Sequence, residues 1–195
     1  MTMKTHVLTA TVLTLQVISA VAQQLKPCDL LFHVSPTANA ITEVTPGMID
    51  HVAIVLSPDS VIEATHRGVV VTPIDSMRSE GYFLVGRVRS RIDPRQTLRN
   101  ARSYMGRSYD FVFLPDNDAI YCSELVQLSY VDKKGRQIFS TVPMSFHDQS
   151  GRVTAYWQHF YAERGMRVPE GLPGTNPAEL SQRRQVRILG RLRRQ

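Results

Sequence analysis

Cys122 stands where the sequence predicts the start of a helix, directly behind the turn-forming run 115–118 (Pro-Asp-Asn-Asp). In the first turn of a helix, unpaired amide N–H groups and the positive end of the helix dipole stabilise a thiolate. A thiolate is a usable nucleophile near neutral pH. The position of Cys122 therefore predicts covalent chemistry, provided that the chain also supplies a base.

A histidine and a carboxylate on neighbouring predicted strands are the candidate partners of this thiol. His51 opens the apolar run 51–55, and Glu63 lies in the next run, 61–64. Because one hairpin joins the two runs, His51 and Glu63 can become cross-strand neighbours. A base and a carboxylate that orients it complete a nucleophilic set with Cys122. Taken singly, His51 is typical of a structural or surface histidine and Glu63 of a surface glutamate, so their combination with Cys122 carries the prediction.

The elements that must position these residues follow an α+β pattern. Apolar or alternating runs separated by turn residues predict strands at 29–34, 51–56, 60–64, 69–73 and 82–88. The three runs between 51 and 73 predict an antiparallel meander. Helices are expected at 94–105, 121–130 and 154–164, with a short helical stretch at 74–80 and an irregular arm, rich in Pro and Gly, at 168–176.

Helical spacing predicts which faces of two helices are buried. In the helix that starts at Pro94, three residues are spaced to face inward: Leu98, Ala101 and Met105. In the cysteine helix, four residues at spacings of three and four share the face against the sheet: Cys122, Leu125, Val126 and Ser129. The thiol is therefore expected at the buried start of its helix.

Length and composition indicate one globular domain behind an export signal. The chain has 195 residues, with 43% hydrophobic and 21% charged content, which is ordinary for a folded domain. Lys4 and His6 precede an apolar stretch that ends in small residues at 20–22, the order of a secretory signal peptide. We expect a signal peptide at 1–22 and a mature domain at 23–195, exported to the periplasm, the cell envelope or the extracellular space. A membrane anchor is the alternative, although the stretch is short for a span of about 20 residues.

Two cysteines in an exported chain raise the alternative of a disulfide between Cys28 and Cys122. A single disulfide would add few covalent constraints to a domain of this size. It would also leave His51 and Glu63 on neighbouring strands unexplained. The interpretation of Cys122 as a nucleophile is preferred, and the disulfide is kept as the alternative.

The net charge of +6 invites a nucleic-acid interpretation, but the distribution of the charges argues against it. Much of the excess lies in the C-terminal segment, at Arg183, Arg184, Arg187, Arg191, Arg193 and Arg194. No aromatic residues interleave with these arginines, as a base-stacking surface would require. We expect a solvated or membrane-facing basic tail, with attraction to anionic polymers of the cell envelope as its consequence.

Other catalytic chemistries lack their motifs. The sequence contains no Gly-x-Ser-x-Gly elbow, no phosphate-binding glycine loop and no His-Glu-x-x-His motif. Four further histidines are scattered without ligand spacing: His33, His66, His147 and His159. The sequence therefore predicts neither a metal site nor a cofactor.

The order of the candidate residues carries a resemblance to a known family. Papain-like hydrolases run cysteine first and histidine later, whereas here His51 precedes Cys122. The runs that match are 29–32 (Asp-Leu-Leu-Phe), 51–55, 61–64, 106–113 and 121–126. On their order and spacing, the chain resembles the circularly permuted NlpC/P60 superfamily, in its YiiX/YebB-like branch of papain-fold cysteine hydrolases. Cys28 is a departure, because the family commonly has glycine before the aspartate.

The resemblance implies a fold and roles for residues. The fold would be a permuted papain-like α+β domain, with an antiparallel sheet or barrel packed against helices and Cys122 at a helix start. His51 would act as general base and Glu63 would orient the imidazole. Tyr121 would either pack in the core or supplement backbone N–H groups at the oxyanion, and similar proteins favour the second role. Tyr109 would pack or line the substrate cleft.

The resemblance also implies substrates. They would be amides of cell-wall peptides, chiefly γ-glutamyl links to diamino acids, cleaved through a thioester. A lipid amidase or acyltransferase of the same fold is the alternative. A non-catalytic binding module of the cell envelope is the rival from another class.

Overall fold

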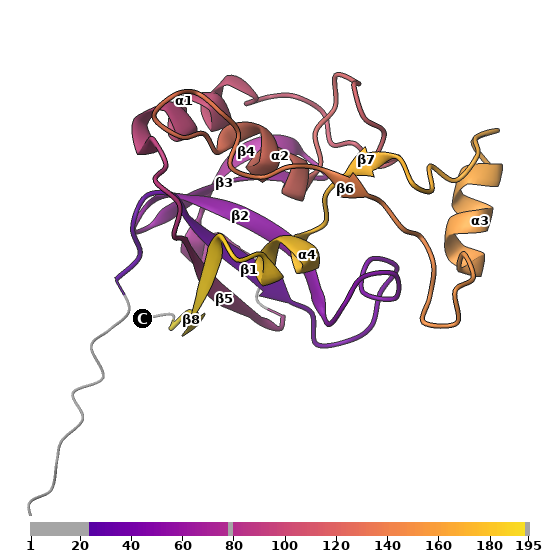
Figure 1. Ribbon diagram of the computed structural model, residues 1–195. Helices are drawn as coiled ribbons and strands as arrows, with labels where there is room; N and C mark the ends of the chain where they lie inside the picture. The colour runs from indigo at the N-terminus through magenta and orange to yellow at the C-terminus, as the bar shows by residue number, and fades with distance from the viewer. Residues whose placement is uncertain (1–23, 78–79, 194–195) are drawn as a thin grey trace, which may run out of the picture.

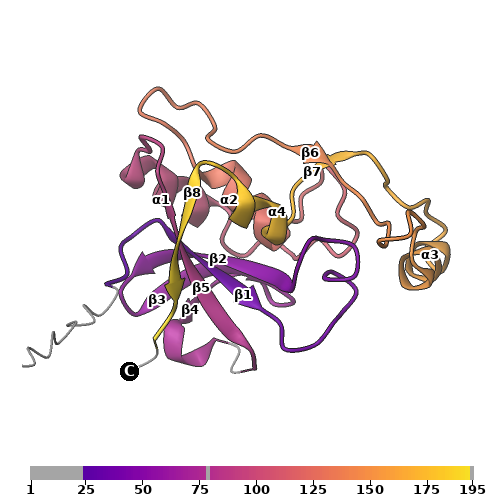
Figure 2. The ribbon, with the colours of Figure 1, turned by 60° about the horizontal axis from the view of Figure 1, so that its bottom comes forward.

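The computed structural model describes residues 24–77 and 80–193, so the predicted signal peptide lies outside the described residues. A six-stranded antiparallel sheet forms the centre, in the strand order β4-β3-β2-β1-β5-β8. Helices α1, α2 and α4 lie over one face of this sheet, while α3 stands away from it (Figures 1 and 2). The strands of the sheet are β1 (Asp29–Val34), β2 (Ile49–Ser57), β3 (Ser60–Thr65), β4 (Gly68–Pro73), β5 (Tyr82–Val88) and β8 (Val186–Arg191).

The predicted strands and their meander are confirmed. Strands β1 and β5 have the predicted bounds, and β2, β3 and β4 pair antiparallel in chain order. The helical stretch predicted at 74–80 is a single 3-10 turn, Ile74–Ser76. A short two-stranded ladder that the sequence did not predict joins β6 (Val142–Pro143) to β7 (Pro173–Gly174).

Helix α1 (Pro94–Ser103) begins as predicted and ends earlier than predicted. The Asp93 side chain accepts a hydrogen bond from the Gln96 amide at 3.0 Å, and Pro94 occupies the first turn. Ala101 is buried, but Met105 is 48% exposed, so the prediction that Met105 faces inward is wrong. The helix stops at Ser103 and the chain turns through residues 104–106, which removes Met105 from the helical face.

Helix α2 (Cys122–Ser129) carries the predicted buried face. Cys122, Leu125, Val126 and Ser129 are all buried, and the helix packs against β2 and β3. At its start the Tyr121 amide donates to the Glu124 carboxylate at 3.3 Å, which satisfies one of the amides that a helix leaves unpaired. The thiol therefore lies at a helix start held in place by packing on the sheet.

The last segment was predicted as a solvated or membrane-facing tail, and most of its described arginine side chains are exposed, but its backbone is folded. Helix α4 (Pro177–Gln182) packs over β1 and β2, and β8 pairs with β5 at the edge of the sheet. The Arg183 guanidinium binds the Glu179 carboxylate at 2.8 Å instead of lying free in solvent. The sequence did not predict β8 because its arginines resemble a solvated tail. At a sheet edge, however, arginine side chains can reach solvent while their backbone pairs with the neighbouring strand.

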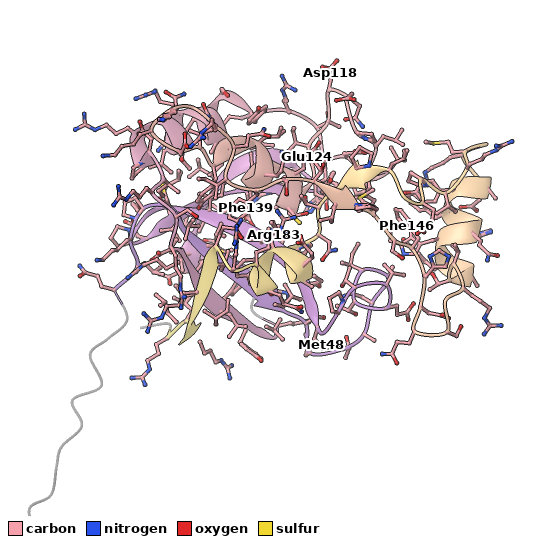
Figure 3. The ribbon with its side chains drawn as sticks, in the orientation of Figure 1. Met48, Asp118, Glu124, Phe139, Phe146 and Arg183 are labelled. Carbon is pink, nitrogen blue, oxygen red and sulfur yellow. The ribbon has the colours of Figure 1, made fainter. Side chains whose placement is uncertain are left out.

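Three clusters of buried side chains hold the molecule together. One lies between the sheet and its helices, and a second lies on the other face of the sheet. The third is centred on Phe146, Trp157 and Tyr161 around α3 (Ala155–Ala162), and we call the segment 144–168 the aromatic lobe. Phe139 lies in the first cluster near Arg183, whereas Phe146 lies apart from it beside α3 (Figure 3). None of the described helices is long and apolar enough to span a bilayer.

Candidate active site

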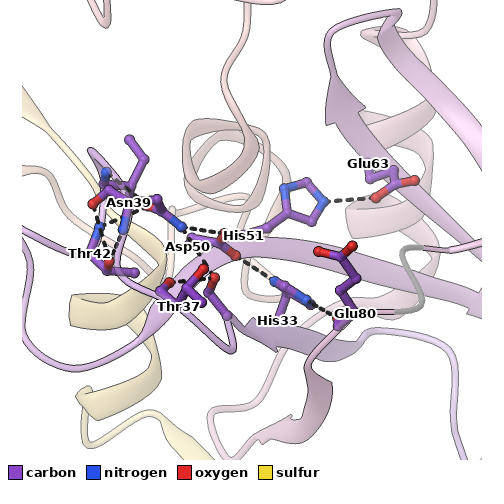
Figure 4. A network of polar contacts seen from close by, with 10 residues as sticks. His33, Thr37, Asn39, Thr42, Asp50, His51, Glu63 and Glu80 are labelled. Atoms are coloured by element: carbon purple, nitrogen blue, oxygen red, sulfur yellow. Dashed lines mark hydrogen bonds and ion pairs between the residues drawn. The ribbon is translucent and has the colours of Figure 1, made fainter.

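His51 stands between a carboxylate and the thiol of Cys122. Its Nε2 lies 2.7 Å from Oε2 of Glu63, which comes from the neighbouring strand (Figure 4). The His51 side chain also hydrogen-bonds to Cys122 at the start of α2. Since Nε2 is engaged by Glu63, Nδ1 is the nitrogen left to face the sulfur. The fold thus brings together three residues that are distant in the sequence.

The surroundings of His51 favour its protonated form. Burial by itself would lower the pKa of the imidazole, but the hydrogen bonds to Cys122 and Glu63 outweigh burial and raise the pKa from 6.5 to about 10. Burial would likewise raise the pKa of Glu63, yet the hydrogen bond and charge of His51 hold it below its ordinary value. An imidazolium between a carboxylate and a sulfur is the arrangement that supports a thiolate.

The two cysteines have different environments. Both are free, so the structure does not contain the disulfide considered from the sequence. Burial and the nearby charges of Asp29 and Asp93 raise the pKa of Cys28 to about 12, which makes that thiol inert at neutral pH. Cys28 also has a φ of 67°, in the left-handed region that favours glycine. Only Cys122 combines a thiol, a helix start and a base.

The two predicted site tyrosines differ in where their hydroxyls lie. The Tyr109 side chain hydrogen-bonds to Cys122, and burial together with the charge of Cys122 raises its pKa well above the ordinary value. The Tyr121 hydroxyl instead accepts a hydrogen bond from the Thr175 amide at 3.1 Å and lies 4.0 Å from the sulfur of Met144. Burial, with a contribution from Glu124, raises the pKa of Tyr121 to about 12. Tyr109 is therefore the tyrosine whose hydroxyl reaches the thiol.

A buried polar network beside His51 was missed by the sequence analysis. Nδ1 of His33 lies 2.6 Å from Oδ1 of Asp50, and the Asn39 amide donates to the other oxygen of Asp50 at 2.9 Å (Figure 4). The Asn39 side chain in turn accepts from the amides of Ile41 and Thr42. The network ties β1 and β2 to the loop at 39–42. The adjacency of Asp50 to His51 was the only sequence signal for it.

Two cavities meet at this group of residues. The thiol-side cavity is narrow and opens to solvent, and Cys122 and Ser123 line it together with side chains of the aromatic lobe. The imidazole-side cavity has about 1210 Å³ of empty space, and His51 and Glu63 line it. Ile41, Asp50 and Tyr109 border both cavities. The hydrogen-bonded row of Glu63, His51 and Cys122 therefore runs from one cavity to the other.

No cluster of three or more His, Cys, Asp or Glu side chains able to hold a metal ion occurs in residues 24–77 and 80–193. The prediction that the chain has no metal site and no cofactor stays a prediction.

A cysteine at a helix start, facing a histidine and a carboxylate on an antiparallel sheet, defines the papain-like class of thiol hydrolases, here with the histidine strand first in the chain. A scan against known protein families matches residues 24–190 to the permuted papain-like amidase enzymes of the YaeF/YiiX, C92 family. The chain belongs to this family. The predicted α+β permuted papain-like fold is thereby confirmed. A search of curated proteins found no match.

Proposed function

We propose that this protein is a cysteine amidase that cleaves its substrate through a thioester on Cys122. The observation that carries the proposal is the hydrogen-bonded row of Glu63, His51 and Cys122 at the start of α2. In the proposal Cys122 is the nucleophile, His51 moves the proton and Glu63 holds the imidazole in one tautomer and orientation. Membership of a family of permuted papain-like amidases supports this reaction class.

The proposed reaction has two halves. The Cys122 thiolate attacks the amide carbonyl carbon, and as the C–N bond breaks, protonated His51 gives its proton to the leaving nitrogen. Neutral His51 then takes a proton from water, which attacks the thioester carbon. The C–S bond breaks, and the carboxylic acid leaves with the sulfur again paired to imidazolium. Each proton returns to its starting place, so the cycle needs no cofactor.

The oxyanion needs hydrogen-bond donors beside the sulfur. The Cys122 amide lies in the first turn of α2, where helix amides lack intrahelical partners. Tyr109 is the side-chain donor that we propose, because its hydroxyl already reaches Cys122. Tyr121 was predicted for this role from the resemblance, but its hydroxyl is engaged by Thr175 and Met144. Substituting each tyrosine separates the two assignments.

Two substrate classes follow from the proposal. Amides of cell-wall peptides, chiefly γ-glutamyl links to diamino acids, rest on the resemblance to NlpC/P60 hydrolases. A lipid amide, for an amidase or acyltransferase, is favoured by the apolar side chains that line the thiol-side cavity next to Cys122. Export, supported by the signal-like residues 1–22, would place either activity in the periplasm, the envelope or outside the cell. The rival, a binding module of the envelope, would have no use for a reactive thiol.

The test combines thiol labelling with turnover. Iodoacetamide should label one thiol, Cys122, and Cys122→Ala should lose both the label and all hydrolysis of γ-glutamyl-diamino acid peptides and acyl amides while keeping its thermal melt. Glu63→Gln should remain folded and slower, because an orienting residue does not bond to substrate. Cys28→Ala is the matched control and should keep label and turnover. Full turnover by folded Cys122→Ala would overturn the proposal, and an unreactive Cys122 would favour the binding module.

A further inference from the structure

We propose that Asp110 is a positioning residue of the site, whose carboxylate holds the loop that sets the Tyr109 hydroxyl against Cys122. Asp110 would not touch the reacting atoms and would act through Tyr109. This role rests on the proposed function, because it requires Tyr109 to be the oxyanion donor. We call residues 109–121 the tyrosine loop.

The Asp110 carboxylate is buried inside a turn that its own loop makes. Only 2% of the residue is exposed. Its Oδ1 accepts a hydrogen bond from the Val112 amide at 2.9 Å, and its Oδ2 accepts one from the Leu114 amide at 2.8 Å. The side-chain amide of Asn117 also donates to Oδ2, at 3.0 Å. A buried carboxylate needs donors around it, so these three bonds fix the path of the loop.

The two ends of the tyrosine loop are tied together directly before the nucleophile. The Asp110 amide donates to the Ile120 carbonyl at 3.3 Å, and the Ile120 amide donates to the Ser108 carbonyl at 2.9 Å. Tyr109 and Ile120 thus pair in a parallel bridge. Ile120 is buried and lies two residues before Cys122. The Tyr109 backbone is therefore held beside the start of α2, where its side chain hydrogen-bonds to Cys122.

The middle of the tyrosine loop needs such an anchor because its backbone is irregular. Within the described residues 111–119, no helix or strand supplies regular hydrogen bonds. Phe113 has a φ of 50° and Asp116 a φ of 60°, both in the left-handed region that residues with a side chain rarely adopt. The bonds to Asp110 take the place of a regular ladder. Loss of the carboxylate should therefore release the loop and let Tyr109 move away from the sulfur.

Other contacts should keep the domain folded when Asp110 is changed. The Tyr161 hydroxyl donates to the Val112 carbonyl at 2.9 Å, and the Phe113 ring packs edge to face on Trp157 at 5.7 Å. Both contacts join the tyrosine loop to the aromatic lobe, and neither involves Tyr109. A substitution of Asp110 should therefore change chiefly the setting of the Tyr109 hydroxyl.

The charge of Asp110 also favours the donor form of Tyr109. Burial is the largest cause that raises the pKa of Tyr109, and the charges of Cys122 and Asp110 raise it further. A phenol with a raised pKa stays protonated near neutral pH and can donate a hydrogen bond. A bare carboxylate would oppose a developing oxyanion, but three donors already face the charge of Asp110.

The test uses p-nitrophenyl acetate as the probe. The Cys122 sulfur forms a bond to the acetyl carbon as p-nitrophenolate leaves, and water then cleaves the thioester to acetate. We expect Asp110→Asn to lower kcat about tenfold and to change KM less than about twofold, because an oxyanion donor acts in the transition state. The physical reason is that the new amide group places a donor against N–H groups that it cannot bind.

Two further variants grade and control the effect. Asn117→Ala removes one of the three donors at an exposed position and should lower kcat about threefold. Asp118→Asn changes an exposed carboxylate of the same loop and should keep the wild-type kcat. An unchanged or raised kcat in folded Asp110→Asn would overturn the assignment. If thermal melts show that Asp110→Asn does not fold, an unchanged kcat in Asn117→Ala would overturn it.

A double-mutant cycle separates positioning from a general structural defect. In a Tyr109→Phe background no hydroxyl remains to be positioned, so Asp110→Asn should lower kcat by less than about a further twofold. A structural defect would lower kcat by the same factor in both backgrounds, and that result would contradict the assignment. A loss confined to KM would also contradict it.

The same probe separates the role of Asp110 from the proposed function. If the wild type releases p-nitrophenolate no faster than Cys122→Ala, the amidase proposal falls and the role of Asp110 falls with it. If the wild type is active and Cys122→Ala is inactive, but folded Asp110→Asn equals the wild type, the amidase proposal stands and only the role of Asp110 falls.

Discussion

At the scale of single residues, the site depends on how strongly the fold changes the proton affinity of one imidazole. His51 has its pKa raised from 6.5 to about 10 by Cys122 and Glu63, against the effect of its own burial. Such a residue is charged at neutral pH before substrate arrives. In the proposed mechanism a protonated His51 is the acid that gives its proton to the leaving nitrogen.

The raised pKa of His51 predicts a pH-dependent stability. A group that binds its proton more tightly when folded stabilises the fold fully below its unfolded pKa, here 6.5, and loses that effect as the pH rises through about 10. The difference in Tm between wild type and His51→Gln should therefore shrink across this interval. In a Cys122→Ala background the shrinkage should be smaller, because the hydrogen bond to Cys122 contributes to the shift. A constant Tm difference across the interval would contradict the prediction.

The two tyrosines predict opposite defects. Tyr109→Phe should lower kcat on the order of 100-fold with little change in stability, as expected for removal of one oxyanion donor. Tyr121→Phe should leave most of kcat and cost about 1 kcal/mol of unfolding free energy, because the buried Thr175 amide loses its acceptor. Steady-state kinetics and urea unfolding of both variants check this pair. A larger loss of kcat in Tyr121→Phe would return the oxyanion role to Tyr121.

At the scale of elements, the sequence predicts regular segments well and contacts between loops poorly. Strands β1 to β5 and helix α2 follow from apolar alternation and helical spacing, and Cys122, His51 and Glu63 follow because each lies within such a segment. The contact of Tyr109 with Cys122 joins an irregular segment to a helix start, and no periodicity encodes it. The His33 and Asp50 pair crosses two strands near a β-bulge, where simple alternation no longer gives the facing residues.

The entry to β1 offers a stability test of backbone conformation. Cys28 holds a φ of 67°, in the left-handed region that favours glycine. A protein with glycine at a given position is usually less stable than the same protein with alanine there. At position 28 we expect the glycine variant to be the more stable of the two. Cys28→Gly should be about 1 kcal/mol more stable than Cys28→Ala, measured as the free energy of unfolding in urea. Alanine equal to or more stable than glycine would contradict the prediction.

At the scale of the whole molecule, the two cavities have walls of different origin. The imidazole-side cavity is bordered by β2, β3 and the turn after β3, together with the loops at 39–41 and 109–111. The thiol-side cavity is closed by the aromatic lobe, which stands apart from the sheet and has its own cluster of buried rings. The two cavities share Ile41, Asp50 and Tyr109, and the aromatic lobe borders the thiol-side cavity alone. Substitutions in the lobe should therefore change substrate preference before they change the reactivity of the thiol.

Because the aromatic lobe has its own small core, it can open as a cooperative unit while the sheet stays folded. Amide hydrogen exchange should therefore be faster in α3 than in α2. Equal protection of the two helices would mean that lobe and sheet unfold together. In the proposed mechanism, local opening of the lobe would let a product leave the thiol-side cavity while His51 stays bound to Glu63. Opening of the lobe, and not bond cleavage, would then limit the rate of turnover.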